Sequence, residues 1–136
     1  DEGAIALAES DSVLQLRYLS LYTNKIGDDG VVAMANSKSL KNLETLDLSF
    51  NRIGDMGAEA LANSSCLKNL KTLHLDANRI GFKGMQAFAE LSGLKSLESL
   101  NITYNLVEPR GLALLDKSPR LQNLDKVKTD VLKADD

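Results

Sequence analysis

Residues 40–62 read LKNLETLDLSFNRIGDMGAEALA, and segments like this one recur along the chain at a fixed spacing. The asparagine of this segment, Asn51, has counterparts at positions 24, 78 and 105, each 27 residues from the next. The flanking residues 14–26, 67–80 and 94–107 align with residues 40–53 without a gap. A fixed period of this length is typical of stacked repeats, in which each unit buries its apolar face against its neighbours.

The first half of each unit has the pattern of a short β-strand. Leu46 and Leu48 alternate with Asp47, which places the two leucines on one buried face. A helix between successive strands returns the chain in the same direction, so each strand is expected to pair in parallel with the strand 27 residues on. The asparagine after each strand is expected to turn inward, because its amide can bond loop backbone that would otherwise be buried without a partner.

The second half of each unit has the pattern of a helix. Asp28 and Asp55 occupy the expected N-cap position, and Pro109 shares their register, close to the first helical position that proline favours. One register of this half carries large apolar residues, which are expected to form a buried spine: Met34, Leu61, Phe88 and Leu115.

The run from Leu43 to Ile53 fits the pattern LxxLxLxxNxI and resembles the leucine-rich repeat. The sequence IGDMGAEALA at residues 53–62 is similar to the ribonuclease-inhibitor-like subclass, which also occurs in Ran GTPase-activating proteins, nucleotide-binding innate receptors and bacterial effectors. The resemblance covers nearly the whole chain. It implies an α/β fold, a right-handed leucine-rich-repeat solenoid in a horseshoe arc, with parallel strands on the concave face and short helices on the convex face.

The repeat predicts a single domain over residues 1–136: a partial repeat at 1–15, four full repeats at about 16–123, and a degenerate C-terminal unit at 124–136. The chain starts at the helix of a unit whose strand is missing, so we expect an excerpt of a longer protein or a processed chain. The first strand, near residues 16–21, would then present an open edge for end-to-end self-association. At the other end Leu132 replaces the expected asparagine and the chain finishes with KADD, which is typical of a natural end.

Composition excludes several classes of protein. Sixteen basic and nineteen acidic residues give a net charge of −3, which argues against a nucleic-acid-binding protein. No apolar run is long enough to span a membrane. The single cysteine, Cys66, excludes an intrachain disulfide and favours a reducing compartment, the cytoplasm or the host cytosol of a secreted effector. We expect no cofactor and no metal.

Function in this architecture is expected on the concave face, where alternate strand residues point outward. The concave face comprises Tyr18, Ser20 and Tyr22; Thr45, Asp47 and Ser49; Thr72, His74 and Asp76; Ser99, Asn101 and Thr103; and Lys126, Lys128 and Asp130. Thr23, Phe50, Ala77 and Tyr104 follow at its rim, so all three tyrosines lie on or beside it. Tyrosine is enriched in binding hot spots. The residues predicted to bind a protein partner are Tyr18, Tyr22, Asp47, Phe50, His74, Asp76, Asn101 and Tyr104.

Catalysis is the alternative to protein binding as the function of this face. His74 has Asp47 one strand over and Asp76 two residues along, and Ser49 lies beside Asp76, so the constituents of a nucleophilic triad or a zinc site come close together. An open sheet without an oxyanion hole or an enclosing pocket favours the interpretation of an ordinary surface histidine. The two carboxylates would favour the charged imidazole and make partner binding vary near pH 6–7.

A short row of basic residues, Lys25, Arg52 and Arg79, follows the first three of the repeated asparagines. The fourth asparagine is followed by Leu106, which ends the row. The simpler interpretation is a solvated rim balanced by acids such as Asp28 and Asp55. The functional interpretation is that Arg52 or Arg79 contacts a GTPase, as the resemblance to Ran GTPase-activating proteins implies. The sequence therefore favours a non-enzymatic recognition module for a protein partner, with an enzyme regulator or a fragment of a larger effector or receptor array as alternatives.

Overall fold

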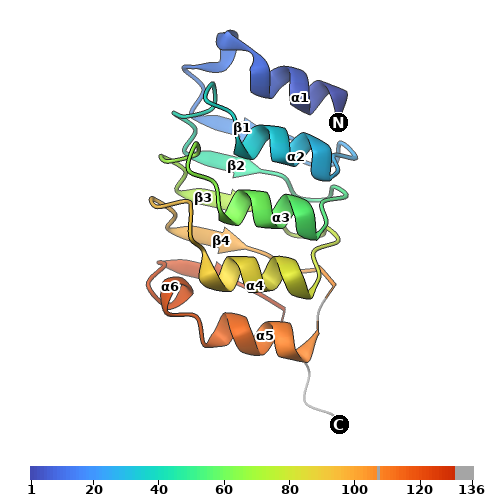
Figure 1. Ribbon diagram of the computed structural model, residues 1–136, viewed down its shortest axis with the longest axis vertical. Coiled ribbons are helices and arrows are strands. Elements are labelled where there is room, and N and C mark those ends of the chain that lie inside the picture. Colours follow the sequence, from blue (N-terminus) through green and yellow to red (C-terminus); the bar gives the residue numbers. More distant parts are fainter. Residues whose placement is uncertain (107, 131–136) are drawn as a thin grey trace.

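The computed structural model describes residues 1–106 and 108–130 and has two layers, helices on one side and a sheet on the other (Figure 1). Leu132 and the KADD tail of the predicted C-terminal unit lie outside the described residues. The helices are α1 (Glu2–Glu9), α2 (Asp28–Ala35), α3 (Asp55–Ala62), α4 (Phe82–Glu90), α5 (Pro109–Asp116) and α6 (Pro119–Gln122), with a 3₁₀ turn at Asp11–Val13. The strands are β1 (Tyr18–Ser20), β2 (Thr45–Asp47), β3 (Thr72–His74), β4 (Ser99–Asn101) and β5 (Lys126–Lys128).

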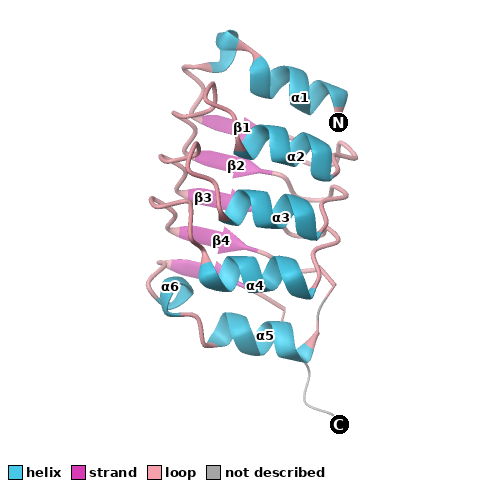
Figure 2. Ribbon diagram, viewed as in Figure 1, coloured by secondary structure: helices cyan, strands magenta, loops and turns pink. Residues whose placement is uncertain are grey.

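The strands form one parallel sheet in the order β1-β2-β3-β4-β5, and its register follows the 27-residue period (Figure 2). Leu46 pairs with Leu73, and Leu73 with Leu100. All three leucines are at most 1% exposed, so they are neighbours in a shared interior layer. Because each helix returns the chain to the start of the next strand, sequential strands become spatial neighbours, as the sequence predicts.

The interior lies between the two layers. The predicted spine is confirmed, since Met34, Leu61 and Phe88 are fully buried and Leu115 is 4% exposed. Leucines of the strands and of the loops before them fill the rest of the core, and those of β2 and β3 are completely enclosed. Burial of this apolar surface is the main stabilising contribution, at about 25 cal/mol per Å².

The inward orientation predicted for the asparagine after each strand is confirmed for Asn51, Asn78 and Asn105, which form a ladder of asparagines, whereas Asn24 is exposed. Asn78 is 7% exposed, and its Oδ1 accepts a hydrogen bond of 3.0 Å from the backbone N–H of Ile53 in the preceding unit. Its Nδ2 is within 3.0–3.3 Å of the carbonyl oxygens of Leu48, Leu75 and Asp76. One amide therefore satisfies backbone groups of two successive loops that water cannot reach.

The prediction that Asp28 and Asp55 are N-cap residues is wrong by one position. Gly27 and Gly54 are the N-caps, with extended backbones, and each aspartate is the first helical residue. The Asp28 carboxylate instead accepts hydrogen bonds of 2.8 Å from Gly54 N and 3.0 Å from Gly57 N, at the start of the next helix. Each aspartate therefore caps the following unit, where the positive end of the helix dipole favours a carboxylate. Pro109 is at the first position of α5, as predicted.

This contact between units predicts a measurable loss of stability in Asp55→Ala. Asp55 Oδ1 accepts 2.8 Å and 2.9 Å hydrogen bonds from Gly81 N and Gly84 N. Loss of a capping carboxylate costs about 1–2 kcal/mol. We expect that decrease in the free energy of unfolding by urea denaturation. Asp29→Ala is the matched control, because Asp29 is an exposed acid in the first turn of α2; an equal loss in the control would contradict this role for Asp55.

A serine ladder on the other side of the units was not predicted. Ser37 and Ser64 are 5% and 4% exposed, and their hydroxyls donate to Ala8 O and Ala35 O of the preceding unit. The same register holds Leu91 in the third full repeat, where the backbone turns left-handed (φ 42°). Gly93 follows it, and a Cβ at Gly93 would overlap the backbone carbonyl of Ser64. This close approach explains the only glycine of the sequence outside the two repeated glycine positions.

Candidate protein-binding surface

The strands present the concave face as the sequence predicts. In β2, β3 and β4 the central leucine is buried and the residues on either side are half-buried. Tyr18 begins the edge strand β1 and is 62% exposed, while Tyr22, just after it, is 58% exposed. Among the described residues no helix covers this face of the sheet, so the large aromatic surface is available for contact with another molecule.

The rim combines exposed aromatics with an unusual backbone. Phe50 and Tyr104 are 58% and 75% exposed, and both have left-handed backbones, with φ of 57° and 56°. Thr23 and Ala77 share this register and this conformation. The Tyr22 and Phe50 rings meet edge to face, 6.5 Å apart at an angle of 83°. This geometry is favourable for an aromatic pair and orients both rings.

The residues of the predicted triad come together, but their contacts differ from those of a catalytic site. Asp47 is opposite His74 on the neighbouring strand. The Ser49 Oγ lies 2.6 Å from an Asp47 oxygen and 2.7 Å from an Asp76 oxygen, and Ser49 is only 7% exposed. The serine hydroxyl therefore bridges the two carboxylates instead of pairing with His74. Over residues 1–106 and 108–130, no three His, Cys, Asp or Glu side chains are grouped so that they could hold a metal ion.

Two other residues of the concave face have structural contacts. The Asn101 Oδ1 accepts hydrogen bonds from the backbone N–H and the hydroxyl of Thr103, at 3.1 Å and 2.8 Å. Asp130 accepts from Tyr104 N at 2.8 Å and from Asn105 N at 3.4 Å. In earlier units the counterparts of Tyr104 N, which are Phe50 N and Ala77 N, donate to backbone carbonyls, and the counterpart of Asn105 N, which is Asn24 N, donates to the Asn51 side chain. The Asp130 carboxylate takes the place of these acceptors in the last unit. Sequence analysis assigned Asp130 only to the concave face.

The side chains of the basic row, Lys25, Arg52 and Arg79, are all exposed. Within the part of the chain that the structure describes, no ion pair involves Lys25, Arg52 or Arg79. The carboxylates of Asp28 and Asp55 bond helix N-termini instead of pairing with the row, and the interpretation of a solvated, balanced rim stays a prediction.

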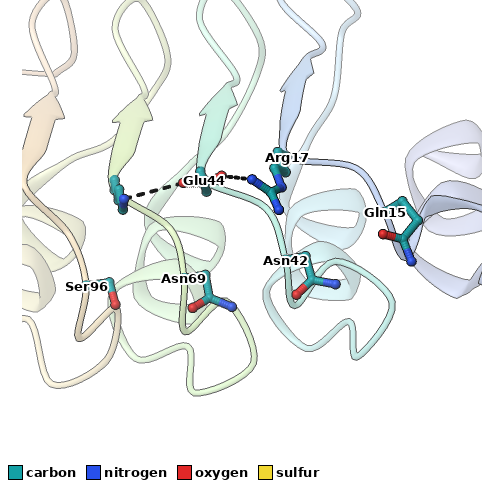
Figure 3. Close-up of a pocket in the computed structure, with 7 residues that line it drawn as sticks. Gln15, Arg17, Asn42, Glu44, Asn69 and Ser96 are labelled. Carbon is teal, nitrogen blue, oxygen red and sulfur yellow. Dashed lines mark ion pairs between the residues drawn. The ribbon is translucent and has the colours of Figure 1, made fainter.

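A polar groove of about 480 Å³ lies at the opposite edge, before the strands begin (Figure 3). Glu44 lies between Arg17 and Lys71, at 3.7 Å and 3.4 Å. Asn42 and Asn69 donate to the backbone carbonyls of Leu14 and Lys41 in preceding units. The groove was not predicted, although four polar residues that line it share one register of the 27-residue period: Gln15, Asn42, Asn69 and Ser96. Exposed ion pairs of this kind contribute about 0–1 kcal/mol each.

Among the described residues, no helix is long and apolar enough to cross a membrane.

The three tyrosines predicted as binding residues are exposed, whereas Asp47, His74, Asp76 and Asn101 are half-buried. The aromatic residues therefore provide most of the accessible area of this surface.

Comparisons with known proteins agree with the repeat architecture. Two family models match, both described as leucine-rich repeat, one over residues 41–107 and the other over residues 16–35. No curated protein sequence matches the chain significantly.

Solved structures with this fold include "Leiomodin-1 Actin-Binding Site 2 (ABS2)", with a TM-score of 0.76 at 16% identity, covering 96% of this chain and 79% of that chain. The tropomodulin C-terminal domain of Caenorhabditis elegans aligns with a TM-score of 0.73 at 13% identity, covering 97% and 83%. At these identities the likeness shows the fold alone, and the ribonuclease-inhibitor-like subclass stays a prediction. The pairing of five parallel strands at the repeat period, the buried leucines and the matching family models together establish that the chain belongs to the leucine-rich-repeat family.

Proposed function

We propose that the chain is a non-enzymatic recognition module that binds a protein partner on its concave face and the adjoining rim. The observation that supports this proposal most strongly is the exposure of Phe50 and Tyr104 at positions where the backbone is left-handed. A left-handed conformation costs a side-chain-bearing residue about 1–2 kcal/mol, and glycine or asparagine relieves much of that cost. Two exposed aromatic side chains at such positions recover little of it by burial, so contact with a partner accounts for their presence.

The arrangement of the neighbouring residues supports the same proposal. The edge-to-face contact between Tyr22 and Phe50 holds two rings in place before a partner arrives. Preorganised aromatic side chains lose little conformational entropy on binding and provide large contact areas. The hydrogen bonds from Ser49 to Asp47 and Asp76 favour a role in holding those carboxylates rather than nucleophilic chemistry.

Actin is the first partner that we propose. Of the two solved structures named above, one is titled as an actin-binding site of leiomodin-1 and the other is a tropomodulin domain. Both align with nearly the whole of this chain, so a surface of the same overall shape can be presented.

The experiment measures the binding of purified actin to the wild-type chain and to the double variant Phe50→Asn/Tyr104→Asn. Asparagine tolerates the left-handed backbone, so we expect the free energy of unfolding to stay equal or to rise by about 1 kcal/mol. Loss of two aromatic contacts is expected to weaken binding at least about tenfold, which is about 1.4 kcal/mol.

The control variant is Ala77→Asn, which changes the same register between the two aromatics without removing a ring. We expect the control to bind nearly as tightly as the wild type. A wild-type chain that does not bind actin would exclude this partner. A double variant that binds as well as the control would exclude a role for the rim aromatics.

A regulator of an enzyme such as a GTPase is the second candidate, because Arg52 and Arg79 are exposed beyond the ladder asparagines. In that case Arg52→Ala would abolish the stimulation of turnover while the enzyme is still bound. A fragment that only extends a larger effector or receptor array is the third candidate. End-to-end association through β1 stays a prediction.

A further inference from the structure

The residues just beyond the carboxyl ends of the strands form a mixed apolar and basic surface, which we name the loop edge. The loop edge comprises Phe50, Tyr104, Leu106, Lys25, Arg52 and Arg79. All six side chains are exposed, and Leu106 is 58% exposed although leucine is the residue that fills the core elsewhere. Leu106 occupies the position of the basic residues at the end of the row, so an exposed apolar side chain follows Tyr104 by two residues.

The loops that carry these residues are held at a fixed spacing. Arg52 N donates to Ile26 O and Arg79 N to Ile53 O, both at 2.8 Å, and Leu106 N donates to Ile80 O at 2.9 Å. Each loop is therefore bonded to the one before it, and the basic residues lie on successive strand spacings of about 4.8 Å. A fixed row of like charges attracts an anionic group more strongly than isolated flexible side chains do.

Among the described residues, no member of the row takes part in an ion pair. The ion pairs of the described residues involve Arg17, Lys71 and Arg110, and none of these belongs to the loop edge. Asp28 and Asp55 accept hydrogen bonds of 2.8–3.0 Å from helix N-termini. Asp76, three residues before Arg79, accepts a hydrogen bond of 2.7 Å from the Ser49 hydroxyl. Like charges that lie side by side without an ion-pair partner favour a binding partner that supplies carboxylates.

We propose that the loop edge binds an acidic protein segment that carries aromatic or aliphatic side chains. The proposal rests on the proposed function of protein recognition and names the chemistry of the partner. Carboxylates of the segment pair with Lys25, Arg52 and Arg79, and its apolar side chains pack on Phe50, Tyr104 and Leu106. Each contact alone is weak, so both kinds are required for affinity.

Other anionic macromolecules fit the loop edge less well. Recognition of an acidic membrane surface uses clusters of about four to eight basic residues, whereas the row has three. Nucleic acids require a strongly basic face, and this chain has a net charge of −3. A short acidic segment of a protein matches both the length of the row and the apolar residues beside it.

Selection from a displayed library of random peptides of about twelve residues tests the chemistry directly. Selection on the wild-type chain, with removal of peptides that also bind Arg52→Glu/Arg79→Glu, is expected to enrich Asp and Glu next to Phe, Trp or Leu. Enriched peptides without acidic residues, or no enrichment, would overturn the proposal.

A synthetic peptide of the enriched sequence is then used to measure how much the substitutions and salt weaken binding. We expect Arg52→Glu/Arg79→Glu to weaken its binding at least about tenfold, and a rise in salt from about 0.05 M to 0.5 M to weaken wild-type binding several-fold. Lys68→Glu/Lys95→Glu is the matched control, because it makes the same change in net charge at exposed lysines in the loops before β3 and β4. Equal losses in the two double variants would show an effect of net charge alone and would overturn the loop edge as the site.

Vesicles of phosphatidylcholine and phosphatidylserine form the third arm. Binding of vesicles, but not of the peptide, in a way that depends on Arg52 and Arg79 would assign the loop edge to a lipid surface and overturn the proposal. The failure of the proposed function is separate. If no acidic peptide is enriched while the Phe50→Asn/Tyr104→Asn variant still binds actin more weakly than the wild type, the proposal of protein recognition stands. Only the acidic segment as the partner is then excluded.

Discussion

Asn78→Ala is expected to lower the free energy of unfolding by about 3–5 kcal/mol. The Asn78 amide accepts from Ile53 N and lies within hydrogen-bonding distance of three backbone carbonyls, all in buried or part-buried surroundings. A buried backbone group left without a partner costs about 1–3 kcal/mol, and alanine leaves several of them at once. The total free energy of unfolding of a typical domain is only about 5–15 kcal/mol, so this variant is expected to be close to unfolding. Urea denaturation followed by circular dichroism measures the change.

Asn24→Ala is the matched control for this prediction. Asn24 occupies the same register but is exposed, and its Nδ2 donates only to Tyr22 O within its own loop. We expect a loss below about 1 kcal/mol, because water replaces the lost hydrogen bond. Comparable losses in the two variants would contradict the assignment of the ladder to the satisfaction of buried backbone.

Phe88→Ala is expected to be similarly destabilising, by about 3–5 kcal/mol. Phe88 is completely buried in α4, at the centre of the spine with Met34 and Leu61. Alanine removes the ring from the core and leaves a cavity, because close-packed neighbours relax only partly. Thermal and urea denaturation measure the effect.

Phe50→Ala provides the comparison within the same residue type. Phe50 is 58% exposed, so its truncation removes little buried area and is expected to change the free energy of unfolding by less than about 1 kcal/mol. A loss at Phe50 as large as that at Phe88 would mean that the rim aromatics belong to the core, against the proposal that they contact a partner.

The parts of the fold that the sequence predicts are those on which the repeat imposes both identity and spacing. The alternation at Leu46 and Leu48 fixes which face of β2 is buried, and the position of Asn51 fixes where the strand turns. The same pattern recurs in the neighbouring units, so a parallel register with a 27-residue offset follows from self-similarity.

The helix caps could not be predicted correctly from local pattern. Glycine and aspartate are both common at N-caps, and the sequence GD places them side by side. The stacking of successive units determines which helix the aspartate caps. The first residue of one helix lies over the N-terminus of the next, which brings the Asp28 carboxylate to Gly54 and Gly57. This tertiary contact joins residues that are 26 and 29 positions apart.

Other elements had a signal that the sequence analysis did not use. The serines at positions 37, 64 and 118 share the repeat period, and Ser118 followed by Pro119 is a helix start that α6 confirms. For the candidate site, periodicity predicts which aromatics are exposed. The left-handed backbone at Phe50 and Tyr104 is not predicted, because the residue types at those positions disfavour it.

The central claim, that a protein partner meets the concave face and its rim, is tested most directly by site-specific photo-crosslinking. Benzoylphenylalanine is placed at Tyr22 or Tyr104 on the concave face and rim, and at Asn63 or Gln86 as exposed positions at the end of α3 and on α4. After irradiation in a lysate of the source organism, we predict one discrete cross-linked protein from positions 22 and 104 and none from positions 63 and 86. Cross-linking from the helical positions, with none from the two tyrosine positions, would contradict the claim.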